Sequence, residues 1–232
     1  MRSERVKEAG AAMSLEVKIC GLSEPRTLDA ALDAGADVVG LVSFPKSPRH
    51  VSVEQAATLA ARARGRARVA LLTVDATDNL IAELVAATMA DILQLHGQES
   101  PERVRALRLI FGREVWKAVP IGEAADVALA QPYWDVADRV LFDARPPAGA
   151  SLPGGNGVAF DWRLLADLDP KQSFVLSGGL TPDSVVEAVQ TTRARAVDVS
   201  SGVERGPGVK DPDLIAAFVT RARSAAVSSS QR

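Results

Sequence analysis

The chain has 232 residues, 47% of them hydrophobic and 24% charged, so it can bury a core of ordinary size in one or two domains. Its 27 lysines and arginines against 29 aspartates and glutamates give a net charge of −2, which argues against nucleic acid or an anionic membrane as a partner. One cysteine excludes an internal disulfide and, with only two histidines, argues against zinc, while a carboxylate site for a hard cation stays open.

The two ends of the chain carry no pattern of structure. No apolar run reaches the roughly 18 residues that a membrane span requires, and residues 1–14 lack the apolar core of a signal peptide, so we expect a cytoplasmic protein. We expect residues 1–14 and 225–232 to be tails, with Met13 as an alternative start, and residues 15–224 to form one catalytic domain.

Short apolar or β-branched segments alternate with longer segments of helical periodicity. The predicted strands cover residues 17–20, 37–44, 68–74, 91–96, 114–119, 139–144, 173–178 and 196–201. The predicted helices cover residues 24–36, 52–65, 79–90, 100–112, 161–168, 181–189 and 211–224. This alternation predicts an α/β protein with a parallel sheet, and eight units predict closure into a (β/α)8 TIM barrel. An open doubly wound sheet is the alternative, but GLSEP after the first strand lacks its glycine-rich phosphate turn.

The first predicted strand, in the segment EVKICG, ends at the only cysteine. Successive side chains of a strand point to opposite faces, so Lys18 and Cys20 should face the barrel axis. Val17 and Ile19 should then face the helices. The same alternation in RVLFDA places Asp143 inward at the C-terminal rim, where barrel enzymes carry their chemistry. Cys20 and Asp143 are therefore candidate catalytic groups, with a buried core thiol and a loop carboxylate as the plain alternatives.

Three further side chains, those of Lys18, Asp198 and His96, are expected to face the inside of the barrel near the candidate catalytic groups. Closure of the barrel brings the last strand beside the first, and Asp198 on that strand faces inward. Because an inward lysine without a partner is costly, we predict a buried pair between Lys18 and Asp198. His96, at the end of the fourth strand, either lines the pocket or satisfies a neighbouring carbonyl group.

Glycine-rich turns follow the last three strands, in PGGNG, SGGL and SSGVERGPG. Glycine permits positive φ and a close approach of the backbone, so successive N–H groups can converge on an anion. Barrels frequently bind phosphate after strands seven and eight, so these turns predict a phosphate site. The best donors are the backbones of Gly155, Asn156, Gly157, Gly178, Gly179, Ser201 and Gly202.

A proline-stiffened loop, FPKSPRH, follows the second predicted strand and carries Lys46 and Arg49. The planar fork of an arginine binds a carboxylate through two parallel hydrogen bonds. Arg49 is therefore a candidate for holding a substrate carboxylate. The alternative is a solvated basic loop.

Seven separated motifs together resemble one enzyme family. KICG, GAD, FPKSPRHVS, QLHG, LFDARPP with GGNGVAFDW, LSGGLTPDSV and VDVSSGVERGPGVKD follow the order found in phosphoribosylanthranilate isomerases, from about residue 16 to 222. The resemblance implies a TIM barrel in tryptophan biosynthesis that converts N-(5-phosphoribosyl)anthranilate into 1-(2-carboxyphenylamino)-1-deoxyribulose 5-phosphate by an Amadori rearrangement. It implies a phosphosugar as the small-molecule partner and leaves the oligomeric state open.

Carried over motif by motif, the resemblance implies that Cys20 is the general base and Asp143 the general acid. It likewise implies that Arg49 binds the anthranilate carboxylate and that the glycine-rich turns bind the phosphate. The rearrangement needs one acid to open the furanose ring and one base to remove the C2 proton. Neither step requires a metal or a nicotinamide, so we expect no cofactor.

Two strands depart from the family pattern. The second strand reads GLVSF and the third LTVD, so that Leu41, Ser43 and Thr73 stand where the family more often has phenylalanine. We expect these differences to alter the aromatic side of the pocket.

Three alternative functions remain. A metal-dependent pentulose-phosphate epimerase would need inward histidines on several strands, of which the sequence offers only His96. A histidine-pathway aldose–ketose isomerase typically uses two aspartates, which leaves Cys20 unexplained. A silent phosphate-binding module would be expected to have lost the acid or the base.

Overall fold

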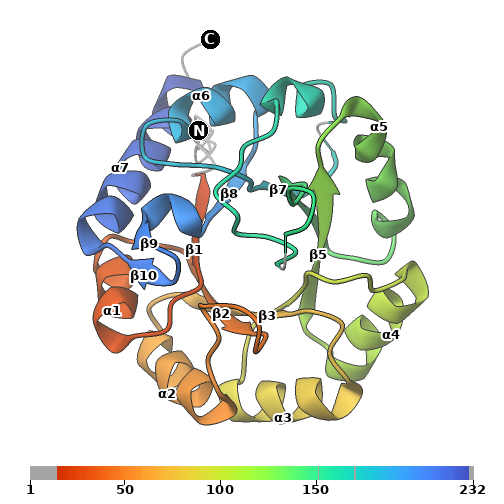
Figure 1. Ribbon diagram of the computed structural model, residues 1–232, viewed down its shortest axis with the longest axis vertical. Coiled ribbons are helices and arrows are strands. Elements are labelled where there is room, and N and C mark those ends of the chain that lie inside the picture. Colours follow the sequence, from red (N-terminus) through yellow and green to blue (C-terminus); the bar gives the residue numbers. More distant parts are fainter. Residues whose placement is uncertain (1–14, 151, 170, 230–232) are drawn as a thin grey trace, which may run out of the picture.

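Eight parallel strands close into a barrel in the computed structural model of the protein, which describes residues 15–150, 152–169 and 171–229 (Figure 1). Each strand pairs with the next in the chain, and β8 pairs with β1, which confirms the TIM barrel over an open sheet. The strands are β1 (Glu16–Cys20), β2 (Val38–Ser43), β3 (Arg68–Thr73), β4 (Ile92–Leu95), β5 (Glu114–Ile121), β6 (Arg139–Ala144), β7 (Phe174–Leu176) and β8 (Ala196–Val199).

Helices cover the outside of the barrel (Figure 1). The α-helices are α1 (Pro25–Asp33), α2 (Val53–Ala63), α3 (Asp78–Thr88), α4 (Pro101–Phe111), α5 (Ala124–Val127), α6 (Val185–Thr192) and α7 (Pro212–Ser229). The 3-10 helices are η1 (Ala128–Tyr133), η2 (Trp162–Leu165) and η3 (Ser201–Val203). Among the described helices, none is both long and apolar enough to cross a membrane.

The structure differs from the predicted helices in three places. The segment between β5 and β6, for which no helix is predicted, forms α5 and η1, with Pro132 inside η1. The helix predicted over 161–168 shortens to η2, where Asp161 caps the turn by accepting a hydrogen bond from the Arg163 N–H. The last helix, α7, continues past residue 224 to Ser229, and Ala225 is buried, so the C-terminal tail does not begin at residue 225. The predicted N-terminal tail lies outside the described residues.

A short antiparallel hairpin is added after β8 and is not predicted. Its strands are β9 (Glu204–Gly206) and β10 (Val209–Lys210), joined by a turn with Gly208 at φ +79°. The turn packs against the β2 loop, because a Cβ on Gly208 would lie 2.6 Å from the Pro48 carbonyl oxygen. The hairpin therefore brings the end of β8 beside the loop that carries Arg49.

Side chains of each strand divide between two cores, as the alternation predicts. Val17 and Ile19 of β1 are fully buried in the large core between strands and helices. A second cluster fills the inside of the barrel and includes Trp116, which has no exposed surface. Val140 of β6 packs outward and Leu141 inward, so the predicted direction of Asp143, two residues beyond Leu141, is confirmed.

An Ala-Asp pair precedes three of the strands and ties each to its neighbour. Asp37, Asp91 and Asp138 stand immediately before β2, β4 and β6. Each carboxylate accepts a hydrogen bond from a backbone N–H of the preceding strand at 2.7–2.8 Å, from Val17, Val69 and Val115 respectively. These contacts help to set the register of three strand pairs at the N-terminal end of the barrel.

Charged side chains close that N-terminal end. Arg139 forms ion pairs with Glu16 at 2.5 Å and with Glu114 at 3.3 Å, and Arg68 forms ion pairs with the same two glutamates. The four residues alternate in charge around the barrel axis and cover the interior cluster. The opposite, C-terminal end is left to build the pocket described next.

Candidate active site

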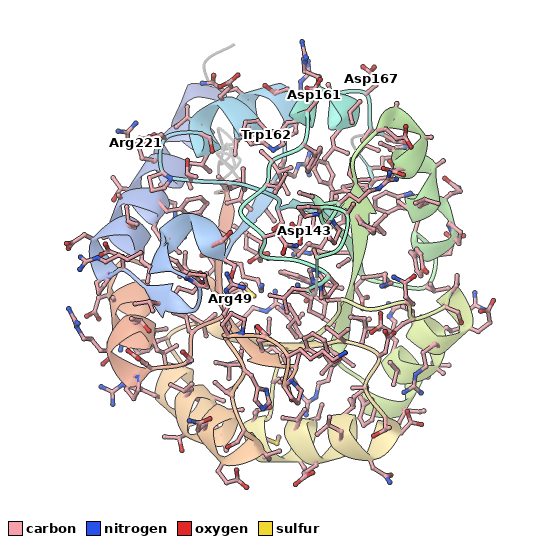
Figure 2. The ribbon with its side chains drawn as sticks, viewed as in Figure 1. Arg49, Asp143, Asp161, Trp162, Asp167 and Arg221 are labelled. Carbon is pink, nitrogen blue, oxygen red and sulfur yellow. The ribbon has the colours of Figure 1, made fainter. Side chains whose placement is uncertain are left out.

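One pocket lies at the C-terminal end of the barrel and collects the residues that the sequence singles out. Figure 2 shows Arg49 and Asp143 over the middle of the barrel, whereas Asp161 and Arg221 lie at its periphery. Cys20, Arg49, His96, Asp143 and Asp198 all line this pocket, together with every residue of the three glycine-rich turns named above as a phosphate donor. The predicted grouping of these residues is confirmed, and their roles are taken up below.

Cys20 ends β1 and points into the pocket with 3% of its surface exposed. It pairs in register with Gly40 of β2, where a Cβ would lie 2.8 Å from the Cys20 Sγ, so glycine provides the space for the thiol. Burial raises the pKa of the Cys20 thiol above its ordinary value, although the nearby Lys18 ammonium favours the thiolate. Burial thus favours the neutral form of the Cys20 thiol.

The predicted pair between Lys18 and Asp198 is confirmed. The two residues are in register on β1 and β8, and Lys18 Nζ lies 2.8 Å from Asp198 Oδ1 with both side chains buried. Burial opposes the charge on Lys18, but the negative charge of Asp198 and the hydrogen bond to it act in the other direction, and the pKa of Lys18 is raised above its ordinary value. Asp198 opposes part of the effect that Lys18 has on the Cys20 thiol.

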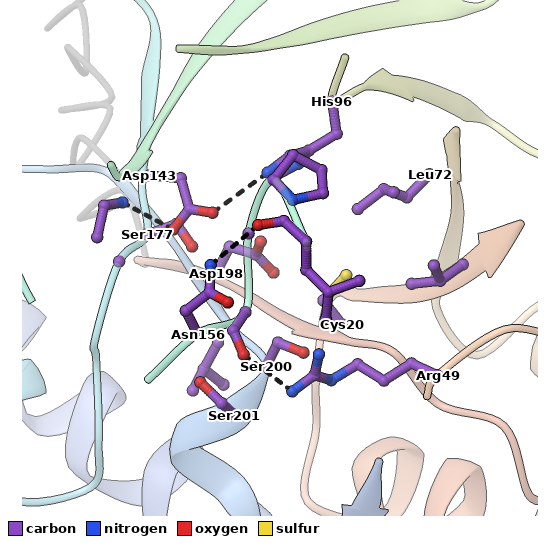
Figure 3. Close-up of a pocket in the computed structure, with 18 of the residues that line it drawn as sticks. Cys20, Arg49, Leu72, His96, Asp143, Asn156, Ser177, Asp198, Ser200 and Ser201 are labelled. Atoms are coloured by element: carbon purple, nitrogen blue, oxygen red, sulfur yellow. Dashed lines mark hydrogen bonds and ion pairs between the residues drawn. The ribbon is translucent and has the colours of Figure 1, made fainter. Parts of the chain in front are cut away.

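Asp143 is the penultimate residue of β6 and contacts His96, which follows β4 and in turn contacts Gln94 of β4. Its Oδ2 lies 3.2 Å from Nε2 of His96, and Nδ1 of His96 lies 3.2 Å from Nε2 of Gln94. Its Oδ1 accepts a hydrogen bond from the Ala144 N–H at 2.9 Å. The His96 ring thus lies between the Gln94 amide and the Asp143 carboxyl group, and it contacts these two side chains rather than a neighbouring backbone carbonyl group. Figure 3 shows this contact and the position of Cys20 around the same pocket.

The three glycine-rich turns approach one another closely above the barrel. A Cβ on Gly202 would lie 1.8 Å from the carbonyl oxygen of Leu180, and one on Gly179 would lie 2.5 Å from the Cα of Ala159. Gly155 and Gly178 have positive φ, of +71° and +82°. The turns after β6, β7 and β8 therefore meet backbone to backbone where they line the pocket.

Arg49 is 5% exposed and its guanidinium points into the pocket, whereas Lys46 is exposed and does not line it. The paired edge of the guanidinium is already taken by Glu204: Nε donates to Oε1 at 2.7 Å and Nη2 to Oε2 at 2.8 Å. Nη2 also donates to the Gly155 carbonyl oxygen at 3.2 Å. The Nε–Nη2 edge is therefore occupied within the protein, and among the described residues no hydrogen bond involves Nη1. The carboxylate-binding role of Arg49 stays a prediction.

The expectation about the missing phenylalanines is wrong. Leu41, Ser43 and Thr73 are buried, but none of them lines the pocket. The alternation of β2 and β3 turns them toward the helices, and the side chains between them face inward. The apolar wall of the pocket is instead formed by Val42, Phe44, Leu72 and Val74.

Two residues of the site escape the sequence analysis. Glu204 and Lys210 belong to the β9–β10 hairpin and form a buried ion pair of 2.7 Å next to Arg49. The turn signal Gly-Pro-Gly between them indicates a hairpin, which would place both residues at one edge of the pocket.

Comparisons with known proteins agree with this arrangement. Residues 17–221 match the family model described as N-(5'-phosphoribosyl)anthranilate (PRA) isomerase. A curated relative from Afipia carboxidovorans, named N-(5'-phosphoribosyl)anthranilate isomerase, is 58% identical over 216 residues, which is 93% of this chain and 92% of the relative.

Solved structures agree as well. The phosphoribosyl anthranilate isomerase of Thermotoga maritima is 32% identical, has a TM-score of 0.81, and matches over 90% of this chain and 99% of its own. A second isomerase structure, solved in complex with reduced 1-(o-carboxyphenylamino)-1-deoxyribulose 5-phosphate, is 32% identical with a TM-score of 0.78 over the same shares. The chain belongs to the N-(5'-phosphoribosyl)anthranilate isomerase family.

Proposed function

We propose that the protein isomerises N-(5'-phosphoribosyl)anthranilate in tryptophan biosynthesis, with Cys20 and Asp143 dividing the two proton transfers. The observation that carries this proposal is that the thiol of β1 and the carboxyl group of β6 line one pocket under the three glycine-rich turns. The family membership of the chain and the ligand of the related solved structure, a reduced form of the reaction product, support the same substrate.

Asp143 acts first, as the general acid. Its protonated carboxyl group donates a proton to the ring oxygen of the ribose, the bond between C1 and that oxygen breaks, and the nitrogen lone pair forms an iminium ion. His96 holds Oδ2 in place through the 3.2 Å contact, so the group keeps one orientation toward the sugar.

Cys20 acts second, as the general base. Its thiolate removes the C2 proton, and the electrons of the C–H bond form the double bond of an enolamine while the iminium charge is neutralised. The enolamine then becomes the ketone when its hydroxyl proton is lost and C1 gains a proton, so substrate and product have the same composition. Burial raises the pKa of the Cys20 thiol and so disfavours the thiolate. The positive charge of the iminium ion stabilises the thiolate at this step and offsets the effect of burial.

The ends of the substrate are held by two separate parts of the pocket. The backbone N–H groups of the glycine-rich turns bind the phosphate, and Nη1 of Arg49 binds the anthranilate carboxylate. The apolar wall at Val42 and Leu72 accepts the aromatic ring. Anchoring at both ends keeps the sugar between the acid and the base, which is the main advantage of an enzyme in a two-step proton transfer.

A direct assay tests the activity. Purified protein is mixed with N-(5'-phosphoribosyl)anthranilate in the presence of a chelator, and the fluorescence of the anthranilate group is followed against a protein-free mixture. We expect the fluorescence to fall faster with protein, in proportion to its concentration. A decay equal to that of the protein-free mixture would exclude this function.

The expected compartment remains the cytoplasm. A single buried cysteine that acts as a thiol requires a compartment in which thiols stay reduced. A metabolic role in amino-acid biosynthesis fits the same location.

A further inference from the structure

A buried cluster of three charged side chains lies beside the pocket and is here called the Arg49 cluster. It consists of Arg49, Glu204 and Lys210, whose side chains are 6%, 3% and 1% exposed. Glu204 lies between the two cations and forms ion pairs of 2.7 Å with each. Lys210 also donates to the backbone oxygen of Ser200 at 2.9 Å and to its Oγ at 3.2 Å. The cluster therefore ties the β2 loop to the end of β8.

The hydrogen bonds of the cluster leave Arg49 one nitrogen for a ligand. A guanidinium has five N–H groups. Glu204 accepts from Nε and from Nη2, and the Gly155 carbonyl oxygen accepts from Nη2, so three of the five are used. Within residues 15–150, 152–169 and 171–229, no hydrogen bond involves Nη1. The orientation of Nη1 is thus determined by the pairing on the opposite edge of the plane.

Two glycines confine the same side chain. A Cβ on Gly21, which has φ +77°, would lie 2.6 Å from Cδ of Arg49, and a Cβ on Gly155 would lie 2.6 Å from Nη1. Both positions require glycine for the space and for the positive φ. The guanidinium therefore occupies a slot that its own loop, β1 and the β6 loop define together.

Charge and orientation make opposite contributions at Glu204. With Glu204 ionised, the Arg49 cluster carries two positive charges and one negative charge. Removing the negative charge would strengthen the field that attracts a substrate carboxylate, whereas removing the paired hydrogen bonds would release the guanidinium from its orientation. A substitution of Glu204 therefore distinguishes the two effects. Tighter binding of a carboxylated ligand would indicate the charge effect, and weaker binding would indicate the orientation effect.

We infer that Glu204 is a positioning residue that aims Nη1 of Arg49 at the substrate carboxylate, and that the Arg49 cluster thereby selects ortho-carboxylated arylamines over uncarboxylated ones. This inference rests on the proposed function, because it needs the carboxylated substrate in the pocket. Lys210 supports Glu204 by balancing its charge. The Lys210 side chain is buried, so little solvent reaches the cluster. This burial lowers the pKa of the Lys210 ammonium group.

The test compares two ligands in one variant. Dissociation constants are measured calorimetrically for reduced 1-(o-carboxyphenylamino)-1-deoxyribulose 5-phosphate and for its counterpart without the carboxylate. In Glu204→Gln we expect the carboxylated ligand to bind about tenfold or more weakly, because an aligned charge-assisted hydrogen bond is lost, and the other ligand to change by less than about twofold. Tighter binding of the carboxylated ligand would show that charge alone matters, and equal weakening of both ligands would show a merely structural role. Either result overturns the inference.

Further variants keep the result specific. Glu204→Asp retains the charge but shortens the side chain, so it should weaken the carboxylated ligand in the same selective way. In an Arg49→Lys background, which has no guanidinium to orient, Glu204→Gln should have almost no additional effect. Glu99→Gln serves as the matched control, since Glu99 is an equally buried glutamate paired with Lys117 at 2.9 Å on the other side of the barrel.

These measurements separate the inference from the proposed function. Failure of the unaltered protein to bind the carboxylated ligand would contradict the function itself. Normal binding by the unaltered protein with unchanged selectivity in Glu204→Gln would contradict only the positioning role.

Discussion

Cys20 lies near a cation of its own strand, Lys18, and near an anion of the neighbouring strand, Asp198. Lys18 favours the thiolate and Asp198 opposes it, while burial of the thiol is the largest influence and raises its pKa. Burial thus favours the uncharged thiol, and the Lys18–Asp198 pair acts on it with two opposing charges. A cationic intermediate then provides the missing positive charge at the moment when the proton is removed.

The opposing effects of these neighbours can be measured separately, because Cys20 is the only cysteine. The ultraviolet absorbance of the thiolate is followed against pH in the substrate-free protein and in two variants. Asp198→Asn removes a negative charge and should lower the pKa of the Cys20 thiol, whereas Lys18→Met removes a positive charge and should raise it.

The direction of each shift decides the outcome. Circular dichroism at each pH controls for unfolding, since each variant leaves one buried charge without its partner. Shifts of the same sign in both variants, or a thiol that titrates below its ordinary range in the unaltered protein, would contradict the electrostatic account of Cys20.

At the scale of elements, the proposed phosphate site is built from turns that contact one another rather than from any one turn. The turn after β8 reaches the turn after β7 so closely that Gly202 has no room for a side chain against Leu180. η3, which begins at Ser201, is a single 3-10 turn of three residues. The predicted anion site therefore lies among several packed turns rather than at the start of one long helix.

Two glycines near the same hairpin provide a matched test. Gly202→Ala should push the β7 and β8 turns apart, and losing an aligned N–H on the phosphate should raise the inhibition constant of inorganic phosphate about tenfold or more. Gly206→Ala, where a Cβ meets nothing within 4 Å, should change the same constant by less than about twofold. Equal constants in both variants would remove the turn after β8 from the phosphate site.

At the scale of the whole molecule, most of the fold follows from the sequence. Buried parallel strands appear as short apolar runs, so all eight were predicted, and closure of the barrel correctly predicted the Lys18–Asp198 pair. The segment between β5 and β6 was missed because it forms only a short α-helix and a 3-10 helix containing Pro132, so its periodicity is too brief.

The candidate site was predicted less completely, for two physical reasons. The partner of Arg49 is 155 residues away in the sequence, and no local pattern indicates that Glu204 occupies the paired edge of its guanidinium. Leu41 and Thr73 do not line the pocket, because the alternation of side chains along β2 and β3 turns them toward the helices.

Charged side chains close the N-terminal end of the barrel, and the pocket lies at its C-terminal end. The central claim is that Cys20 and Asp143 carry the two proton transfers at the open end. The matched control is Asp138→Asn, at the N-terminal end of β6, where the carboxylate accepts a hydrogen bond from the Val115 N–H at 2.8 Å and forms an ion pair with Arg108.

The most direct measurement is the turnover number of Cys20→Ala and of Asp143→Asn, followed by anthranilate fluorescence with circular dichroism as the check on folding. We expect each variant to lose about a hundredfold or more, the usual contribution of a general acid or base, while Asp138→Asn stays within about threefold of the unaltered protein. Near-normal turnover in a folded Cys20→Ala or Asp143→Asn variant would contradict the assigned role of that residue and, with it, this account of the reaction.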